Sequence, residues 1–339
     1  MRAALLTQLN APLEICEIHP ALLEYGQVRV RVIASGICGA QLQECRGDKG
    51  THFPRLMGHE GVGIVEEIGD GVKLVSAGDR VCMHWRKGDG IECESPCYAI
   101  KIDGHWRGDM TGGQVVTFAT HSICSENRLT RVADDCPDEL ALLLGCSLST
   151  ALGVIENEAN VRFGESVLII GCGGLGLNLI LAAKLRQAGV IWAIDVNHEK
   201  LERARGIGAD GVWMPEMGGS IGDDFDVVID TTGNAERLAQ GIDLLKPSGR
   251  LVMVGQPTGD VIIPNAKRMF EGSGKRIIAT QGGRFSPSRD IPRYIAMWRA
   301  GRLNLDGLIS HRFPLSRINE ALDCVRQGLA GRVLIDCHE

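Results

Sequence analysis

Residues 167–176 read VLIIGCGGLG, and this stretch decides the fold. Its first four residues form a short, wholly apolar run, and its glycines have the G-x-G-x-x-G spacing. Apolar residues at helical spacing then continue from Leu175 to Arg186. A buried strand that enters a helix through such a turn is typical of a βαβ unit that binds a dinucleotide. The stretch therefore predicts a dinucleotide site.

The glycines of this turn have separate roles. Gly171 permits the tight turn after the strand, Gly173 lets a pyrophosphate approach the backbone, and Gly176 lets the helix pack closely on the strand. The backbone N–H groups at the start of the helix, which include those of Gly174 and Leu175, lie at the positive end of the helix dipole. We expect these groups to face the phosphates.

An acidic residue follows the second apolar run, Val190 to Ile194. This residue is Asp195, and an acidic side chain roughly 20 positions after the last glycine typically binds the adenosine ribose hydroxyls. Because its charge would repel a 2′-phosphate, Asp195 favours NAD over NADP.

The two halves of the chain differ in the pattern of their apolar residues and glycines. Residues 1 to about 145 contain β-branched segments separated by many glycines, which predicts a β-rich part with tight turns. Beyond Cys146, apolar runs alternate with helical patterns, which predicts a doubly wound parallel sheet covered on both faces. The later strands are expected at Val227 to Ile229, Arg250 to Val254, Arg276 to Ala279 and Arg332 to Ile335.

Composition narrows the classes of partner and location. The chain has 339 residues, of which 44% are apolar and 23% charged, and its net charge is −6. We expect no nucleic-acid partner, because no basic block occurs. Neither a signal peptide nor a membrane-spanning apolar run is apparent, so we expect a cytoplasmic protein without a membrane partner. The twelve cysteines are then expected to be thiols or metal ligands.

Three short segments contain residue types that bind metals. They are Gly36-Ile-Cys38, Gly58-His-Glu60 and Leu144-Gly-Cys146. Two cysteines, one histidine and an open position are one ligand set of catalytic zinc. None of the segments holds a local CxxC pair, so spacing alone does not identify a site. Taken singly, each residue is more simply explained as part of the core.

Longer motifs occur here in the order typical of a known family. They are Cys38, Gly58-His-Glu-Gly-Val-Gly-Ile-Val-Glu-Glu-Ile-Gly69, Ala77-Gly-Asp-Arg-Val81, Leu144-Gly-Cys146, the dinucleotide segment, Ile309-Ser-His-Arg-Phe and Ile318-Asn-Glu-Ala-Leu322. Over essentially its whole length, the chain closely resembles the zinc-containing medium-chain alcohol and polyol dehydrogenases. The resemblance implies an α/β fold in which a Rossmann doubly wound parallel sheet is inserted in a β-rich, barrel-like catalytic domain. The implied boundaries are 1–147 and 284–339 for the catalytic domain and 148–283 for the NAD-binding domain.

The resemblance also implies a catalytic metal site. By this likeness, Cys38, His59 and Cys146 bind one zinc ion, and Glu60 is a nearby carboxylate that can approach the metal during ligand exchange. The implied reaction is reversible hydride transfer between an alcohol and NAD.

The resemblance also implies two residues that contact the cofactor and an oligomeric state. Lys200 resembles the family's ribose-contacting lysine, and Arg332 resembles its arginine near the cofactor pyrophosphate. Relatives of this kind are dimers or tetramers, so a homodimer or homotetramer is expected.

Two positions after Cys38 depart from the family pattern. The residue that is Ser or Thr in many relatives, where it relays the alcohol proton, is Ala40. The following Asp, which usually supports the histidine ligand, is Gln41; a Gln can still accept a hydrogen bond from an imidazole N–H. The proton is then expected to leave through water, substrate hydroxyls or a side chain such as Gln43 or His52.

The segment that holds a structural zinc in some relatives is also altered. Those relatives have four closely spaced cysteines, whereas this chain offers only Cys82, Cys93 and Cys97. We therefore expect one zinc per chain and no structural zinc. Residues 83–114 are expected to shape the substrate cleft or a subunit contact, and the candidates there are Trp85, His105 and Trp106.

The substrate is predicted only as a class. The polar, glycine-rich segment and the aromatic content of 4% favour a polyol, sugar or cyclitol over an apolar alcohol. Three alternatives remain: a zinc-containing reductase of an unusual carbonyl or activated double bond, a catalytically silent nucleotide-binding protein, and another Rossmann enzyme such as a methyltransferase. Only the upstream zinc residues argue against the last.

Overall fold

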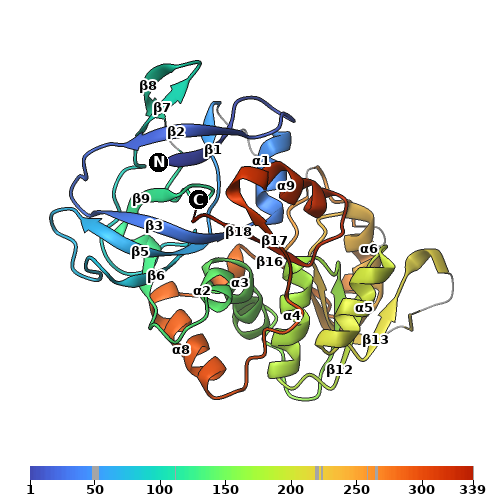
Figure 1. Cartoon of the computed structure of the whole chain (residues 1–339). Helices are drawn as coiled ribbons and strands as arrows, with labels where there is room; N and C mark the ends of the chain where they lie inside the picture. Colours follow the sequence, from blue (N-terminus) through green and yellow to red (C-terminus); the bar gives the residue numbers. More distant parts are fainter. Residues whose placement is uncertain are drawn as a thin grey trace.

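The apolar runs beyond Cys146 form a six-stranded parallel sheet (Figure 1). In a doubly wound sheet of this kind the strands adopt the spatial order 3-2-1-4-5-6, and the order here is the same. The strands, across the sheet, are β13 (Gly211–Trp213), β12 (Val190–Ile194), β11 (Ser166–Ile170), β14 (Phe225–Asp230), β15 (Leu245–Met253) and β16 (Arg276–Ala279). Its helices are α4 (Gly174–Leu185), α5 (His198–Ile207), α6 (Ala235–Asp243) and α7 (Ala266–Phe270).

The β-rich part contains two further sheets, one of which is completed by the end of the chain. The five-stranded sheet consists of β4 (Arg55–Leu56), β1 (Arg2–Leu6), β2 (Glu14–Pro20), β7 (Tyr98–Ile102) and β8 (His105–Met110). The seven-stranded sheet consists of β10 (Leu129–Arg131), β6 (Arg80–Met83), β5 (Gly61–Ile68), β3 (Gln27–Gly36), β18 (Arg332–Asp336), β17 (Ile309–Pro314) and β9 (His121–Ser125), which also pairs with β3.

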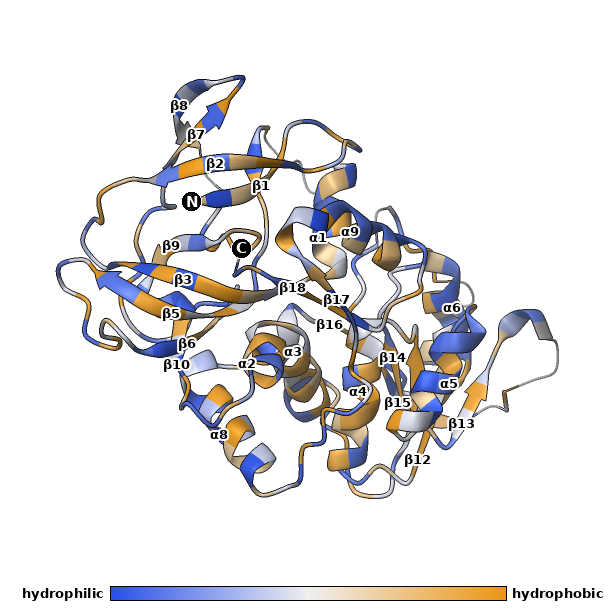
Figure 2. Cartoon of the chain, in the orientation of Figure 1, coloured by the Kyte–Doolittle hydropathy of each residue, from blue (hydrophilic) through white to orange (hydrophobic). Residues whose placement is uncertain are grey.

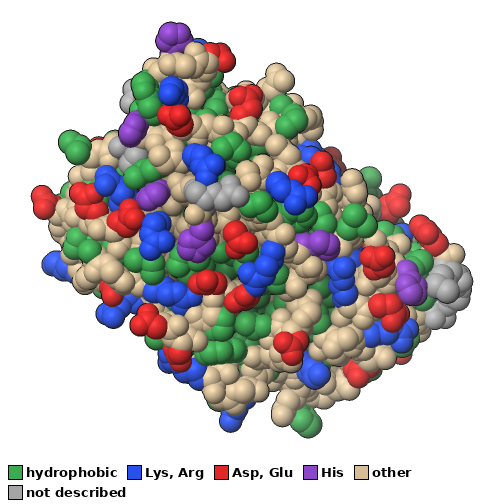
Figure 3. Space-filling view, viewed as in Figure 1, with side chains coloured by type: hydrophobic (Ala, Val, Ile, Leu, Met, Phe, Trp, Pro, Cys, Tyr) green, Lys and Arg blue, Asp and Glu red, His purple; other side chains and the backbone are tan. Residues whose placement is uncertain are grey.

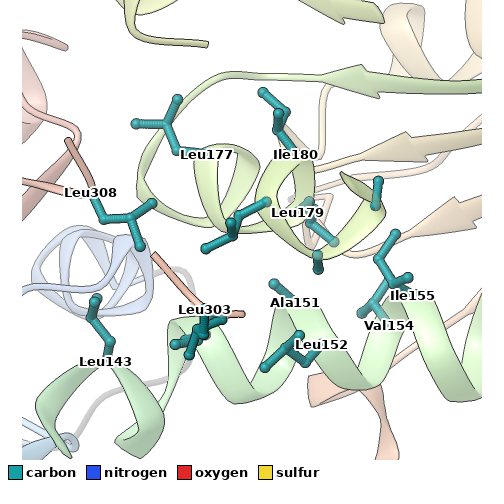
Figure 4. Packing of buried hydrophobic residues seen from close by; sticks show 14 of the residues in the cluster. Leu143, Ala151, Leu152, Val154, Ile155, Leu177, Leu179, Ile180, Leu303 and Leu308 are labelled. Carbon is teal, nitrogen blue, oxygen red and sulfur yellow. The ribbon is translucent and has the colours of Figure 1, made fainter. Parts of the chain in front are cut away.

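Helices join the two parts. The segment between them forms α2 (Asp138–Gly145), α3 (Ser147–Gly153) and a π-helical turn, η2 (Val154–Glu158). Side chains from this segment, including Ala151 and Leu152, pack against Leu177 and Leu179 of α4 (Figure 4). The remaining helices are α1 (Gly39–Arg46), α8 (Pro287–Arg299) and α9 (Ile318–Arg326), with short 3₁₀ turns η1 (Glu126–Arg128), η3 (Pro215–Met217), η4 (Gly282–Arg284) and η5 (Leu315–Arg317).

This arrangement follows from the pattern of apolar residues. The central strands β11 and β14 are buried almost throughout, since helices cover both faces of the parallel sheet. Figure 2 shows the hydrophobic residues concentrated along these strands and along α3 and α4. All strands of the parallel sheet lie within residues 148–283, and β17 and β18 return to the sheet that contains β3. The residue-level boundaries of the domains remain predictions.

The computed structural model describes residues 1–47, 53–110, 112–217, 221–222, 224–257, 259–263 and 266–338. Within these ranges, no single helix is both long and apolar enough to cross a membrane; α2 and the helical run from Ser147 to Glu158 pass that test only as a pair bent by 59°. Basic, acidic and hydrophobic side chains are interspersed over the face shown in Figure 3. All twelve cysteines are free thiols.

Candidate metal centre and dinucleotide turn

Three segments that are distant in sequence bring Cys38, His59 and Cys146 together. Cys38 lies between β3 and α1, His59 precedes β5, and Cys146 separates α2 from α3. Their ligand atoms all lie within 4.8 Å of one another, and the two Sγ atoms are 3.9 Å apart. Two thiolates bound tetrahedrally at about 2.3 Å from zinc lie about 3.8 Å apart. The geometry of the donor set therefore fits one zinc ion.

Gly58 explains why His59 can reach this point. The backbone at Gly58 has a φ of 98°, which favours glycine. A Cβ at Gly58 would lie 2.4 Å from the backbone nitrogen of Phe118. The glycine before the histidine therefore allows the chain to pass close to a neighbouring segment and enter β5 with His59 turned toward the two cysteines.

The surroundings favour the ionised form of Cys38. The hydrogen bond that Cys146 donates to Cys38 holds the pKa of the Cys38 thiol well below its usual range, and His59 and Arg332 act in the same direction. Burial opposes them but is outweighed. Because the thiolate is the form that binds metal, this electrostatic setting suits a metal ligand.

Gln41 connects two of the ligands. The backbone N–H of Cys38 donates to Gln41 Oε1 over 2.7 Å, and Gln41 Nε2 lies 2.7 Å from His59 Nδ1. The expectation that Gln41 accepts from the imidazole is therefore wrong in its direction: its oxygen is taken by the Cys38 amide, so its amide nitrogen donates to the ring. The orienting contact itself is present, but a neutral ring that accepts at Nδ1 carries its proton on Nε2. Zinc at Nε2 would therefore require the ring proton on Nδ1 and an acceptor in place of the Gln41 amide nitrogen.

Glu60 lies beside this cluster and is held by Arg332. The two side chains are buried and form an ion pair through Glu60 Oε1. Glu60 Oε2 is also buried and has no hydrogen-bond partner in the part of the chain that the structure describes. A buried carboxylate oxygen without a partner is costly, so a cation next to Glu60 would relieve that cost. Burial lowers the pKa of Arg332, while the nearby Cys38 opposes that change.

The three glycines of the turn have the contacts that their predicted roles require. Gly171 has a φ of 95°, which permits the tight turn. A Cβ on Gly176 would lie 1.8 Å from the carbonyl oxygen of Gly171, so only glycine lets the helix pack here. A Cβ on Gly173 would meet nothing within 4 Å. The open side of the turn at Gly173 is where a pyrophosphate would approach, and Gly174 and Leu175 begin α4 beside it.

Asp195 lies directly against the turn. One carboxylate oxygen accepts from the backbone N–H of Cys172 over 2.7 Å, and the other accepts from Asn197 over 3.0 Å. Each carboxylate oxygen has a second lone pair, so ribose hydroxyls can still donate to Asp195.

The last strand approaches the same place from the catalytic part. Lys200 Nζ lies 3.1 Å from the position of a Cβ on Gly328, and Arg332 Cδ lies 3.2 Å from that of a Cβ on Gly174. Arg332 therefore lies between the metal cluster and the dinucleotide turn. The cofactor contacts assigned to Lys200 and Arg332 stay predictions.

Comparison with known proteins identifies the family. Residues 24–134 match the alcohol dehydrogenase GroES-like domain family, and residues 174–298 match the zinc-binding dehydrogenase family. Alcohol dehydrogenase 6 of Peromyscus maniculatus is 29% identical, over 98% of this chain and 97% of that protein. The chain belongs to the zinc-containing medium-chain dehydrogenases. The predicted family, fold class and enzyme class are therefore confirmed.

Solved structures of medium-chain dehydrogenases agree with this assignment. Benzyl alcohol dehydrogenase from Acinetobacter calcoaceticus is 27% identical with a TM-score of 0.88, over 99% of this chain and 98% of that one. An alcohol dehydrogenase zinc-binding domain protein from Burkholderia ambifaria is 26% identical with a TM-score of 0.87, over the same shares. The similarity thus extends over the whole fold.

A cavity adjoins the metal centre of this medium-chain dehydrogenase. His59 and Trp85 line it, as predicted for Trp85, together with Arg55 and Gln114, which the sequence analysis did not identify. Its other lining residues are Glu44, Leu56, Gly58, Gly112, Gly113 and Val115. The cavity is thus built from α1, β4 and the two ends of the 83–114 segment.

Other candidates from the sequence lie elsewhere. His105 and Trp106 belong to β8 of the hairpin that projects from the molecule (Figure 1), and the Trp106 ring lies against His19 with centroids 4.6 Å apart and planes tilted by 47°. Gln43 donates to the carbonyl of Gln256 over 3.5 Å and is not among the cavity-lining residues. His52 lies outside the described residues.

The three cysteines expected in place of a structural-zinc site, Cys82, Cys93 and Cys97, have separate surroundings. Cys82 is buried in β6, Cys93 donates to the carbonyl of Tyr25, and Cys97 is exposed. Burial raises the pKa of the Cys82 thiol strongly, which favours the neutral form. Cys82 thus has the surroundings of a core residue and differs in this respect from Cys38.

Proposed function

We propose that this zinc-dependent dehydrogenase transfers hydride reversibly between a small polar alcohol and NAD, with one zinc ion per chain. The observation that carries the proposal is the convergence of Cys38, His59 and Cys146 beside a cavity that His59 also lines. An alcohol in that cavity would lie next to the metal ligands. A dinucleotide bound at the Gly171–Gly176 turn would lie on the side of Arg332 away from the metal ligands.

The donor set fits the charge of the metal. Cys38, His59 and Cys146 would hold the ion, because two thiolates and a neutral imidazole cancel its formal charge and leave a fourth position open. Bound zinc would supply Lewis acidity toward an alcohol oxygen, and bound NAD would supply the hydride-accepting ring. Gln41 orients His59, and Arg332 holds Glu60 within the protein.

The cofactor side relies on backbone geometry and one charge. Gly173 and the start of α4 would receive the pyrophosphate. Asp195 would accept hydrogen bonds from the ribose hydroxyls and repel a 2′-phosphate, which supports NAD over NADP. Since Ala40 has no hydroxyl, we propose that the alcohol proton leaves through the cavity, where Glu44 and Gln114 offer polar groups.

The test combines metal analysis with a substrate screen. Alcohols, polyols and sugars are screened for NAD reduction by the absorbance of NADH, and zinc is measured in the purified protein. We expect about one zinc per chain, and Cys146→Ala should lose both the metal and the turnover. The matched control is Cys136→Ala, a buried cysteine that is not among the three proposed ligands, which should keep both.

Retention of zinc by Cys146→Ala would contradict the ligand assignment. A zinc-loaded protein that oxidises no alcohol but consumes NADH with a carbonyl or an activated double bond would favour the alternative reductase. A homodimer or homotetramer, a cytoplasmic location and the absence of a structural zinc stay predictions.

A further inference from the structure

The cavity beside His59 contains an arginine, Arg55, that forms neither a hydrogen bond nor an ion pair with any described residue. Arg55 pairs with Leu6 in the antiparallel ladder between β4 and β1. Neighbouring residues of a strand point to opposite faces; Leu56 is fully buried and the Arg55 side chain is on the cavity side. Its Nη2 atom lies 3.2 Å from the position of a Cβ on Gly113, so the guanidinium rests against the cavity wall at a residue without a side chain.

Arg55 differs from three other arginines of low exposure. Arg80, Arg128 and Arg250 each pair with a carboxylate. The Arg55 guanidinium is partly buried, yet among the described residues it makes no hydrogen bond or ion pair. A guanidinium has five N–H donors and stays charged at all ordinary pH values. The Arg55 nitrogens are not among the buried polar atoms that lack a partner, so they remain in contact with solvent, and an anion that enters the cavity can replace that water.

Gln114 supplies a second unsatisfied group to the same cavity. Its Nε2 donates to Ser95 Oγ over 3.1 Å. Its Oε1 is buried and has no partner among the described residues. An amide oxygen of this kind accepts a hydrogen bond from a hydroxyl. Glu44 also lines the cavity; its carboxylate can accept from a hydroxyl but would repel an anion. The lining therefore suits an anionic group at Arg55 with hydroxyls at Gln114 and Glu44.

Trp85 closes the cavity on the side of the parallel sheet. A Cβ on Gly282 would lie 2.4 Å from Trp85 Cζ2, so the indole is packed tightly on the backbone of η4. Arg86 donates to the carbonyl of Gln281 over 3.0 Å and fixes the same contact. The wall opposite β4 is therefore held in place.

We propose that Arg55 binds an anionic group of the alcohol substrate, a carboxylate or a phosphate ester, while Gln114 accepts a hydrogen bond from another hydroxyl of the same molecule. This inference rests on the proposed function, because it concerns the alcohol that lies beside His59. The substrate class is then a hydroxylated acid or a phosphorylated polyol. Arg55 is a specificity-determining residue in this assignment.

The experiment compares matched neutral and anionic alcohols on the zinc-loaded enzyme with NAD. One pair is sorbitol and gluconate, and the other is glycerol and glycerol 3-phosphate. We expect kcat/KM to favour the anionic member of one pair by about tenfold or more, the value of a hydrogen bond to a charged group. A preference in the first pair identifies a carboxylate, and a preference in the second identifies a phosphate ester.

Variants of Arg55 test the residue itself. Arg55→Gln should lower the ratio of kcat/KM for the anionic compound to that for the neutral one by about tenfold. Arg55→Lys should retain part of the preference, because lysine keeps the positive charge but cannot donate two parallel hydrogen bonds as a guanidinium does. The control is Arg46→Gln at the exposed end of α1, which does not line the cavity and should keep the ratio. Neutral alcohols that are equal or better in both pairs, or an unchanged ratio in Arg55→Gln, would overturn the inference.

Equilibrium binding separates this inference from the proposed function. The same four compounds are titrated calorimetrically into the zinc-loaded enzyme with NADH, in the wild type and in Arg55→Gln. If no alcohol is oxidised but an anionic compound binds more tightly and loses that advantage in the variant, the proposed function fails and the anion site stands. If alcohols are oxidised and the four bind alike, or none binds, the anion site fails.

Discussion

The dinucleotide turn and the metal centre are built in opposite ways. Residues 166–176 form the turn almost alone, because strand, glycines and helix start follow one another along the chain. The metal centre needs Cys38, His59 and Cys146, which three separate elements bring within 4.8 Å. A local site is determined by short-range sterics, whereas a site of this second kind exists only after two sheets and the joining helices have packed.

The two sites also differ in how far they depart from the family pattern. Gly171 has the positive φ and Gly176 the close contact that their roles require, Gly173 is open on one side, and Asp195 lies beside the turn. Around the metal ligands, Ala40 lacks the relay hydroxyl and Gln41 replaces a carboxylate. Backbone sterics at the turn leave little freedom, while the neighbours of a metal ligand can change provided that the ligand stays oriented.

Alanine at two glycines of the turn gives the largest contrast. Gly176→Ala should lower the free energy of unfolding by about 3 kcal/mol or more, because the new Cβ would overlap the Gly171 carbonyl. Gly173→Ala should leave the stability of the free chain nearly unchanged and weaken NADH binding, since its Cβ occupies the open side of the turn. Urea unfolding and NADH titration measure the two effects.

The comparison between these two glycines would break down in either of two cases. A Gly176→Ala chain as stable as the wild type would mean that the helix can shift away from β11. Unchanged NADH affinity in Gly173→Ala would place the pyrophosphate elsewhere.

Asp195→Asn tests the charge at the edge of the turn and should have an intermediate effect. The amide keeps an oxygen for the Cys172 N–H but removes the charge that repels a 2′-phosphate. We expect the ratio of kcat/KM for NADP to that for NAD to rise by about tenfold, equivalent to about 1.4 kcal/mol. Asp210→Asn is a matched control, because Asp210 accepts from Ile191 at the other end of β12. An unchanged ratio would refute the ribose assignment.

Gln41→Glu tests the metal centre and should have the smallest effect. Zinc bound through His59 Nε2 requires the proton on Nδ1, and the Gln41 amide faces Nδ1 with its nitrogen. A carboxylate can accept from both the Cys38 N–H and the ring, so zinc affinity should rise by up to about tenfold. Competition with a chelator measures it, and Gln43→Glu brings the same charge on the same helix without contacting a ligand. Equal gains in both variants would show that only net charge matters.

Much of the fold could be predicted because short-range patterns determine it. The strands expected at Arg276–Ala279 and Arg332–Ile335 lie within a residue of those bounds, since short β-branched runs bounded by turn residues leave few alternatives. The ligands Cys38 and Cys146 were different: nothing local distinguishes them from buried Cys82, and only the family resemblance selected them.

The substrate cavity was the least predictable region. Arg55 follows a Pro in a short strand, and Gln114 follows two glycines, so neither has a local signal of function. Both matter because β4 and the 83–114 segment meet beside His59. Trp85 and Trp106 have the same side chain, but one lines the cavity and the other lies on a projecting hairpin. Their different positions result from tertiary packing, which cannot be predicted from the residues next to each tryptophan in the sequence.

The ion pair between Glu60 and Arg332 gives the two sites a common element. Glu60 follows a metal ligand directly, and Arg332 reaches Gly174 at the start of the cofactor helix. A metal ion bound beside Glu60 would compete with Arg332 for that carboxylate and could leave the guanidinium available to an anion at the turn. Thermodynamic linkage is reciprocal: if bound zinc raises the affinity for NAD by some factor, bound NAD raises the affinity for zinc by the same factor. If zinc raises the affinity for NAD in this way, the equilibrium affinity for zinc should be higher with the dinucleotide bound than without it.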